Sequence, residues 1–104
     1  MSEFEFSDQN EVLDEDRTTL AEPPRYRILI HNDHYTTMEF VVEILLEVFH
    51  FERVQAEKIM LTVHRKGLGS CGEYEHQIAE TKVAEVERRA AEAGFPLRCT
   101  MEPI

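Results

Sequence analysis

The stretch that decides the fold of this 104-residue chain is 26–49, which reads YRILIHNDHYTTMEFVVEILLEVF. It begins with Tyr26–His31, a short run rich in β-branched and aromatic side chains that predicts a strand. Asn32 and Asp33 follow, and this pair favours a loop. From Phe40 onward, apolar side chains recur at helical spacing, which indicates an amphipathic helix. The stretch therefore predicts a strand, a short loop and a helix in direct succession.

The start of this helix carries a capping sequence. Thr36 is the predicted N-cap, and Glu39, three residues later, is its reciprocal partner in a capping box. Tyr35 and Phe40 stand at the positions of a hydrophobic staple. The helix is therefore expected to begin immediately after Thr36.

The sequence after residue 50 predicts two more helices and two more strands. Apolar side chains recur at helical spacing over 52–66 and 75–93, and a glycine follows each segment. The glycine-rich segment 67–74 favours a loop that leads into a short strand, and 97–102 alternates apolar and polar side chains as a half-buried strand does. The side chains of the two helices that are predicted to face the core are Val54, Ala56, Ile59, Met60, Val63, Ile78, Ala79, Val83, Val86 and Ala90.

These segments give the order β-α-α-β-α-β, which predicts an α+β fold. The expected architecture is a two-layer sandwich, in which a three-stranded antiparallel sheet packs against three helices. We assign this core domain to 25–104. Residues 1–24 are expected to form a flexible acidic arm, because eight acids and one base within 1–22 give a charge of −7 and a Pro-Pro pair closes the segment.

Composition and charge exclude several classes of protein. The net charge of −10 argues against binding to nucleic acid, which needs clustered Lys and Arg. No apolar run approaches the roughly 18 residues of a membrane span, and the N-terminus resembles neither a secretory signal nor a transit peptide, so a cytoplasmic protein without a membrane partner is expected. Cys71 and Cys99 form no CxxC pair and are expected to be reduced, buried thiols, with a disulfide or a metal site as the alternatives.

Three groups of residues could carry chemistry. They are the loop 31–34, the helical face formed by Met60, Val63 and His64, and the start of the first helix with Met38, Val41 and Val42. Each group also has a simpler explanation. A stripe of Met and Val packs in a core, a histidine in the last turn of a helix interacts with the helix dipole, and Asn-Asp after a strand makes a turn.

Enzymatic and metal-binding interpretations have weaker support. The chain has no GxSxG, HExxH or phosphate-binding glycine loop, and nothing specific supports a catalytic pairing of Cys and His. His31, Asp33, His34 and His64 would be the ligands of a metal site, but their spacing matches no established pattern. No cofactor is therefore expected, and the residues alone indicate an α+β interaction domain.

Four blocks of the sequence, spread over 24–102, resemble the ClpS family of protease adaptors. The first block, IHNDHYTTMEFV (30–41), is similar to the NDDYTPMEFV segment of that family. The later blocks follow in the family's order and are MLTVH (60–64), CG (71–72) with AETKV (79–83), and PLRCTME (96–102).

The resemblance implies an adaptor and not an enzyme. Members of the family bind proteins that begin with a bulky hydrophobic residue (Leu, Phe, Tyr or Trp), which is called an N-degron, through the free α-amino group. They deliver these substrates to a Clp AAA+ unfoldase, usually ClpA, and the ClpP protease. By this resemblance the chain is a monomer whose partners are N-degron substrates and the N-domain of the unfoldase, and the arm 1–22 serves delivery.

The resemblance also implies the residues of the site. Those that would hold the α-amine are Asn32, Asp33 and His64, with His34 at the rim. Those that would enclose the first side chain are Thr36, Met38, Val41, Met60, Val63 and Leu97, while Lys82 would belong to the unfoldase-docking face. Because a free α-amine has a pKa of about 7.7–8.0, it is largely an ammonium at pH 7 and needs acceptors such as an Asn carbonyl, an Asp carboxylate and a neutral His nitrogen.

Two residues depart from the family's pattern. His34 replaces a second Asp, which removes a negative charge from the rim and leaves the affinity and the preferred first residue open. Thr37 replaces a proline at the first helical residue. The competing interpretation is a generic interaction domain of the same layout, such as the C-terminal domain of the bacterial ribosomal stalk protein, which would not need Asn32 and Asp33 paired with His64.

Overall fold

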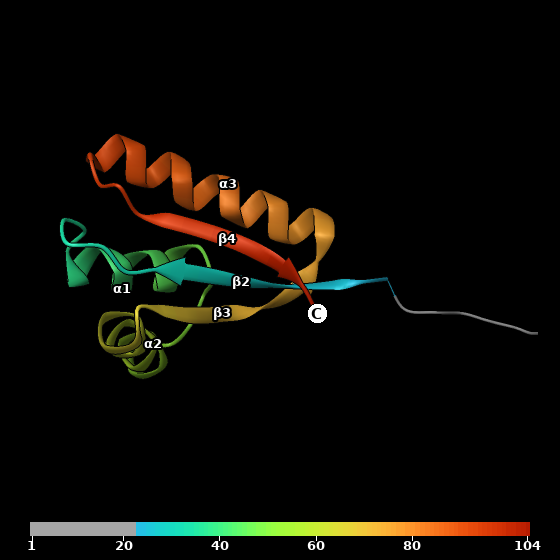
Figure 1. Cartoon of the computed structure of the whole chain (residues 1–104), viewed down its shortest axis with the longest axis horizontal. Coiled ribbons are helices and arrows are strands. Elements are labelled where there is room, and N and C mark those ends of the chain that lie inside the picture. Colours follow the sequence, from blue (N-terminus) through green and yellow to red (C-terminus); the bar gives the residue numbers. More distant parts are fainter. Residues whose placement is uncertain (1–22) are drawn as a thin grey trace, which may run out of the picture.

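The computed structural model describes residues 23–104, so nearly all of the predicted arm lies outside the described residues. The elements of the described part follow in the order β2 (Arg25–His31), α1 (Met38–Glu47), α2 (Arg53–Lys66), β3 (Leu68–Glu75), α3 (His76–Ala93) and β4 (Arg98–Pro103) (Figure 1). The three strands of residues 23–104 form an antiparallel sheet in the order β3-β2-β4. The predicted α+β class and order of elements are confirmed.

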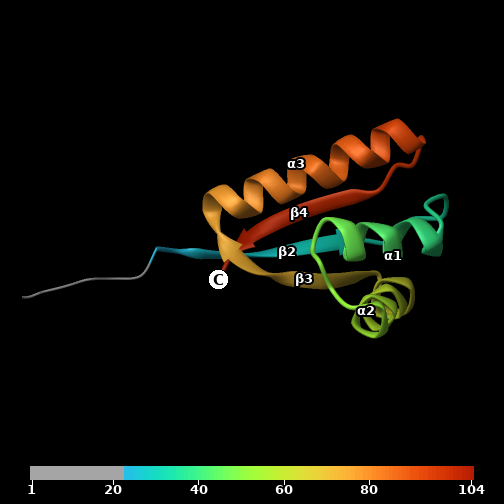
Figure 2. The same cartoon turned by 180° about the vertical axis from the view of Figure 1, so that it is seen from behind.

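The three helices of the described residues pack against different parts of the sheet. Helix α1 lies behind β2 in Figure 1 and in front of it in Figure 2, so it lies across one face of the sheet. Helix α3 runs beside β4, whereas α2 contacts both α1 and β3. Ile28 and Ile30 of the central strand are fully buried and join the core formed with the helices. None of the helices in residues 23–104 is long and apolar enough to cross a membrane.

Helix α1 begins one residue later than predicted. Thr37, not Thr36, is the N-cap, and its hydroxyl accepts a hydrogen bond from the Phe40 N–H at 3.1 Å. Thr36 instead donates its hydroxyl to Asp33 at 2.7 Å, which holds it in the preceding loop. The predicted capping box is therefore wrong, and Thr37 precedes the first helical residue. The predicted staple is also wrong, because Tyr35 is 77% exposed and Phe40 packs against Phe95.

The glycine-rich segment after α2 is a strand from its start. Strand β3 begins at Leu68, directly after the residue that ends α2, whereas the sequence favoured a loop. The pairing with β2 contains an irregularity at which Ile28 faces both Cys71 and Gly72. Gly72 has a φ of 108°, which suits this bulge. Gly72 is therefore part of strand β3, at its bulge, and does not mark a loop.

Two apolar side chains predicted for the core are exposed. Val54 is 67% exposed, and Ile78 is also exposed. Each residue of a helix turns roughly 100° from the previous one, so Val54 lies about 200° from buried Ala56 and Ile78 lies about 100° from buried Ala79. Both side chains extend the apolar pattern in the sequence but point away from the face that packs.

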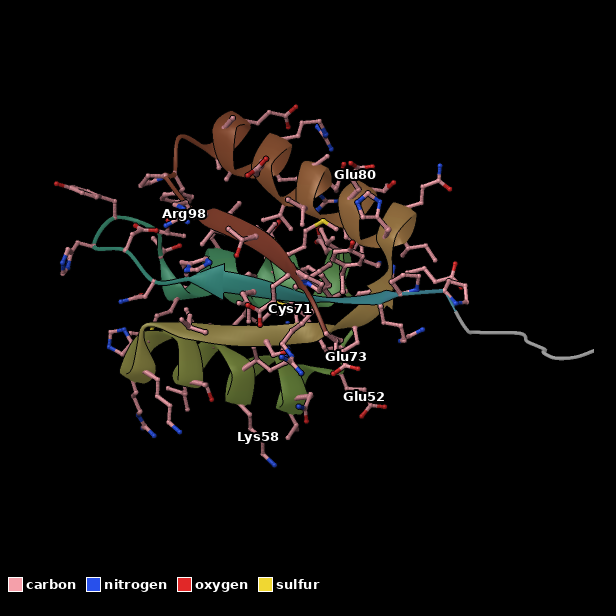
Figure 3. The ribbon with its side chains drawn as sticks, turned by 45° about the vertical axis from the view of Figure 1, so that its right-hand side comes forward. Glu52, Lys58, Cys71, Glu73, Glu80 and Arg98 are labelled. Carbon is pink, nitrogen blue, oxygen red and sulfur yellow. The ribbon has the colours of Figure 1, made fainter. Side chains whose placement is uncertain are left out.

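The prediction of two buried thiols is confirmed. Cys71 and Cys99 are free and buried, and Figure 3 labels Cys71, which belongs to β3, in the middle of the molecule. Burial raises the pKa of Cys99 to about 12, and the negative Glu87 contributes to the rise. Burial also raises the pKa of Cys71 far above its usual range, with a smaller contribution from Cys99. Both groups therefore act as small apolar core residues.

Candidate functional site

A cavity of about 570 Å³ lies where the loop after β2 meets α1 and α2. It brings together nine residues predicted for the site, which are Asn32, Asp33, His34, Thr36, Met38, Val41, Met60, Val63 and His64. The remaining lining residues are Tyr35, Thr37 and Glu39. Leu97 is not among the residues that line this cavity and is buried in the core, so its place in the pocket wall stays a prediction.

One backbone hydrogen bond joins the two halves of the cavity. The Asn32 N–H donates to the carbonyl of Gly67 at 2.9 Å. Gly67 ends α2 in a left-handed conformation (φ 94°), and its own N–H donates to the Val63 carbonyl at 3.0 Å. The last turn of α2 carries His64. This contact therefore brings Asn32 and His64, which are far apart in sequence, to the same cavity.

Asp33 organises the loop with three hydrogen bonds. Its Oδ1 accepts from the N–H groups of Tyr35 (2.8 Å) and Thr36 (2.7 Å), and its Oδ2 accepts from the Thr36 hydroxyl (2.7 Å). Partial burial by itself would raise the pKa of Asp33, but these hydrogen bonds and the neighbouring His34 outweigh it and lower the pKa. Since a carboxylate oxygen has two lone pairs, Oδ2 keeps one for a further donor.

The other side of the cavity is apolar, and its side chains differ in how deeply they are buried. Val41 and Val63 are buried and form its inner surface, and Met60 is half-buried. Met38, the first residue of α1, is 43% exposed and stands at the open side. The cavity thus combines hydrogen-bond acceptors at the loop with an apolar surface between the helices. This arrangement suits a ligand with a cation next to an apolar side chain.

Comparison with known proteins gives the family. Residues 21–100 match the family model described as "ATP-dependent Clp protease adaptor protein ClpS". The chain belongs to the ClpS family. The ClpS of Oleidesulfovibrio alaskensis is 53% identical over 97 residues, which cover 93% of this chain and 90% of that protein. The ClpS of Desulfotalea psychrophila is 49% identical over 102 residues and 98% of each chain. Both are named ATP-dependent Clp protease adapter proteins.

A solved structure supports the same assignment. Agrobacterium tumefaciens ClpS2 bound to L-phenylalaninamide matches with a TM-score of 0.77 and 40% identity, covering 80% of this chain and all of that chain. The family resemblance predicted from the sequence is thereby confirmed, and with it the description of the chain as a Clp protease adaptor. The three lining residues that the ClpS resemblance did not assign, Tyr35, Thr37 and Glu39, lie within the same block as those that it did.

The metal-binding interpretation gains no support from the described residues. Within residues 23–104, no three His, Cys, Asp or Glu side chains are grouped so that they could hold a metal ion. The His31 ring, one of the four proposed ligands, instead makes a 2.8 Å hydrogen bond with the Thr100 hydroxyl across the sheet. Partial burial, and then the positive charge of Arg98, lowers the pKa of His31, which favours its neutral form.

Lys82 lies away from the cavity and has a structural contact of its own. Its ammonium donates to the carbonyl of Val48, the C-cap residue of α1, at 2.8 Å. The same ammonium lies 5.7 Å from the ring centre of Phe49 and 5.3 Å from that of Tyr74. Lys82 therefore anchors the end of α1 to α3, in addition to any contact with a partner.

Strand β3 approaches α2 closely at Gly69, next to Val63, which lines the cavity. A Cβ at Gly69 would lie 2.8 Å from a methyl group of Val63 and 3.5 Å from the Ile59 carbonyl. We predict that Gly69→Ala lowers the free energy of unfolding by about 1–3 kcal/mol, because Val63 or the helix must shift. Urea denaturation measures the change.

A double-mutant cycle tests the cause. Val63→Ala alone is expected to cost roughly 1–3 kcal/mol, through lost burial and the space left behind. In the double variant, Val63→Ala removes the methyl group that would clash with the new Cβ at residue 69. The free energy of unfolding of the double variant should therefore fall by less than the sum of the two single losses. Additive costs would show that Gly69 does not position Val63.

Proposed function

We propose that this ClpS-family protein binds proteins with a bulky hydrophobic first residue (Leu, Phe, Tyr or Trp) in the cavity between the 32–37 loop, α1 and α2. It then delivers them to a Clp AAA+ unfoldase, ClpA or an equivalent, for degradation by ClpP. The observation that supports this most is one cavity with acceptor groups at one end and an apolar surface at the other. The Agrobacterium relative binds phenylalaninamide, whose free α-amine and apolar side chain are the groups that such a cavity complements.

The acceptor end suits the α-ammonium group, which has three N–H donors. We assign these to the Asn32 side-chain carbonyl, the free lone pair of Asp33 Oδ2 and a neutral ring nitrogen of His64. The lowered pKa of Asp33 keeps its carboxylate ionised at neutral pH. His34 is exposed at the rim and is not assigned a bond to the amine. The loop bonds of Asp33 hold the acceptor in place before the substrate arrives.

The apolar end suits the first side chain. Transfer of a Leu or Phe side chain from water contributes roughly 1.5–3 kcal/mol. Met38 and Met60 have flexible, polarisable side chains and can adapt to aliphatic or aromatic shapes. Val41 and Val63 are buried and stiff, and would limit the depth that a side chain reaches. Amine and side chain are thus recognised together.

The remaining roles follow from this function. We propose that the chain catalyses no reaction, acts as a cytoplasmic monomer and uses its acidic 1–24 arm during delivery. The free thiols and their raised pKa values support a reducing compartment and argue against a nucleophilic role for either cysteine. We place the unfoldase-docking face on α3, where Gln77, Ile78, Thr81 and Lys82 line a shallow cavity.

Acetylation of the substrate tests the proposed function most directly. A Phe-led peptide with a free α-amine should bind, and N-acetylation should weaken binding roughly a hundredfold or more, because it removes the charge and leaves the acceptors that the peptide covers without donors. Fluorescence anisotropy measures both affinities. A Gly-led peptide with a free amine is the control for the side chain. Equal binding of the acetylated and free peptides would refute the assignment of the cavity to N-termini.

The pH dependence of binding tests His64. A protonated imidazole has no acceptor nitrogen and repels an ammonium. Asp33 stays ionised between pH 7.5 and 5.5, because its pKa is lowered from a value that is already below this range. We therefore expect binding of Phe-led peptides to weaken as the pH falls. His64→Ala should weaken binding roughly tenfold to a hundredfold at pH 7.5 and flatten the pH profile.

The control for this experiment is the other histidine of the rim. His34→Gln changes a histidine to which we assign no bond with the amine, so it should keep most of the pH dependence. Wild-type affinity in His64→Ala at pH 7.5 would contradict the amine-binding role of His64.

Delivery is tested separately from binding. Ile78→Asp and deletion of 1–22 should both leave the affinity for Phe-led peptides unchanged, because Ile78 does not line the cavity and none of the residues that we assign to substrate binding belongs to 1–22. Both should slow degradation of a Phe-led reporter by the unfoldase and ClpP severalfold. Ile78 is a better probe than Lys82, since Lys82 also anchors α1. Release of reporter fragments measures the rate.

Val54→Asp is the matched control, because it makes the same change at an exposed apolar residue on α2. It should leave delivery intact. If Ile78→Asp leaves the degradation rate unchanged, the assignment of the docking face to α3 is wrong. If deletion of 1–22 leaves it unchanged, the arm has no role in delivery.

A further inference from the structure

A second cavity, which we call the α1–α2 groove, lies between these two helices and has a volume of about 610 Å³. Its apolar surface comes from Met38, Val42, Leu46, Met60 and Leu61. Leu61 is among the exposed large apolar side chains of the described residues. The groove therefore offers apolar area that the core leaves uncovered.

The rim of the groove is acidic. Its carboxylates are those of Glu39, Glu43, Glu47 and Glu57. Two of them have cationic neighbours, since Arg53 lies 3.9 Å from Glu57 and Arg89 forms an ion pair with Glu47. Within residues 23–104, neither Glu39 nor Glu43 takes part in an ion pair. An occupant with positive charge would therefore find acceptors along the rim.

The groove continues from the cavity that we assign to the first residue. Met38, Glu39 and Met60 line both. The acids of α1 recur every four residues from Glu39 to Glu47, so they span about 12 Å at 1.5 Å per helical residue. An extended chain rises about 3.3 Å per residue. The acidic rim thus matches about four residues of an extended peptide.

We propose that the α1–α2 groove binds the substrate chain directly after its first residue, about residues 2–5, and favours basic and apolar side chains there. This inference rests on the proposed function, because the first residue brings the following chain to the groove. Charge argues against two other occupants. The 1–22 arm carries −7 and a second copy of the chain carries −10, so either would bring negative charge to an acidic rim.

The experiment compares three Phe-led peptides with free amines that differ only at residues 2–5. One carries Lys, Arg and Leu there, one carries Asp, Glu and Leu, and one is neutral and small. At low salt, we expect the full chain to bind the basic peptide roughly tenfold more tightly than the acidic one, as a few exposed charge pairs allow. High salt should reduce this ratio, because it screens exposed charges.

The variant Glu43→Gln/Glu57→Gln removes two rim charges that do not line the first-residue cavity. It should reduce the ratio of basic to acidic affinity to about threefold or less and leave the neutral peptide unaffected. The matched control is Glu75→Gln/Glu80→Gln, which changes the net charge equally outside the groove; Figure 3 shows Glu80 on α3. The control should keep the full ratio.

NMR chemical shifts locate the bound chain. Phenylalaninamide alone should shift residues around the first cavity, whereas the basic peptide should also shift the amides of Leu46 and Leu61, which line only the groove. Leu61→Ser, at an exposed position, should weaken the basic peptide with Leu but leave the neutral peptide unchanged.

The outcomes separate this inference from the proposed function. If the neutral peptide binds but the basic and acidic peptides bind equally, or the double variant keeps the full ratio, the groove assignment is wrong and the proposed function stands. If the neutral peptide with a free amine does not bind, the proposed function fails and the groove assignment fails with it. If an acetylated basic peptide binds as tightly as the free one, the groove is an independent docking site and its assignment to the substrate chain is overturned.

Discussion

The hydrogen bond from the Asn32 N–H to the Gly67 carbonyl is the contact on which the candidate site depends. It joins the end of the central strand to the end of α2, and both termini would otherwise leave backbone groups without partners. Gly67 can present its carbonyl there because it adopts a left-handed conformation, which glycine favours. The space around it is open, since a Cβ at this position would have no other atom within 4 Å. The acceptors of the loop and the last turn of α2 therefore reach one cavity through backbone geometry, without a direct bond between their side chains.

Asp33 extends this constraint into the loop. Its carboxylate orders Tyr35 and Thr36 and so fixes where α1 begins. The same carboxylate is assigned to the substrate amine, and the two roles are compatible because only three of its four lone pairs are used within the loop. An acceptor that is already held in place loses little conformational freedom on binding. A single side chain thus connects the local structure of the loop with recognition.

The sequence predicted the order of the elements because apolar spacing reports which face of each helix and strand is buried. It placed nine residues in the cavity because they belong to two contiguous blocks that resemble a known family. It misplaced the N-cap, since Thr36 and Thr37 have equal intrinsic capping ability and only the bond to Asp33 decides between them. It read 67–74 as a loop because pairing with β2, which accommodates Gly72 at a bulge, depends on residues distant in sequence. The sequence assigned Leu97 to the pocket only through the family resemblance, and its burial in the core depends on tertiary packing.

Helix α1 connects the candidate site with the proposed docking face. Its first residue, Met38, lines the cavity, and its C-cap carbonyl, at Val48, accepts a hydrogen bond from Lys82 of α3. The ten residues of α1 span about 15 Å, and each end is fixed by a polar contact, at Thr37 and at Lys82. Between these ends α1 packs into the core through Ile44 and Leu45. The candidate site and the proposed docking face therefore lie at opposite ends of one helix, and for this reason we expect that substitution can alter either one while the other is retained.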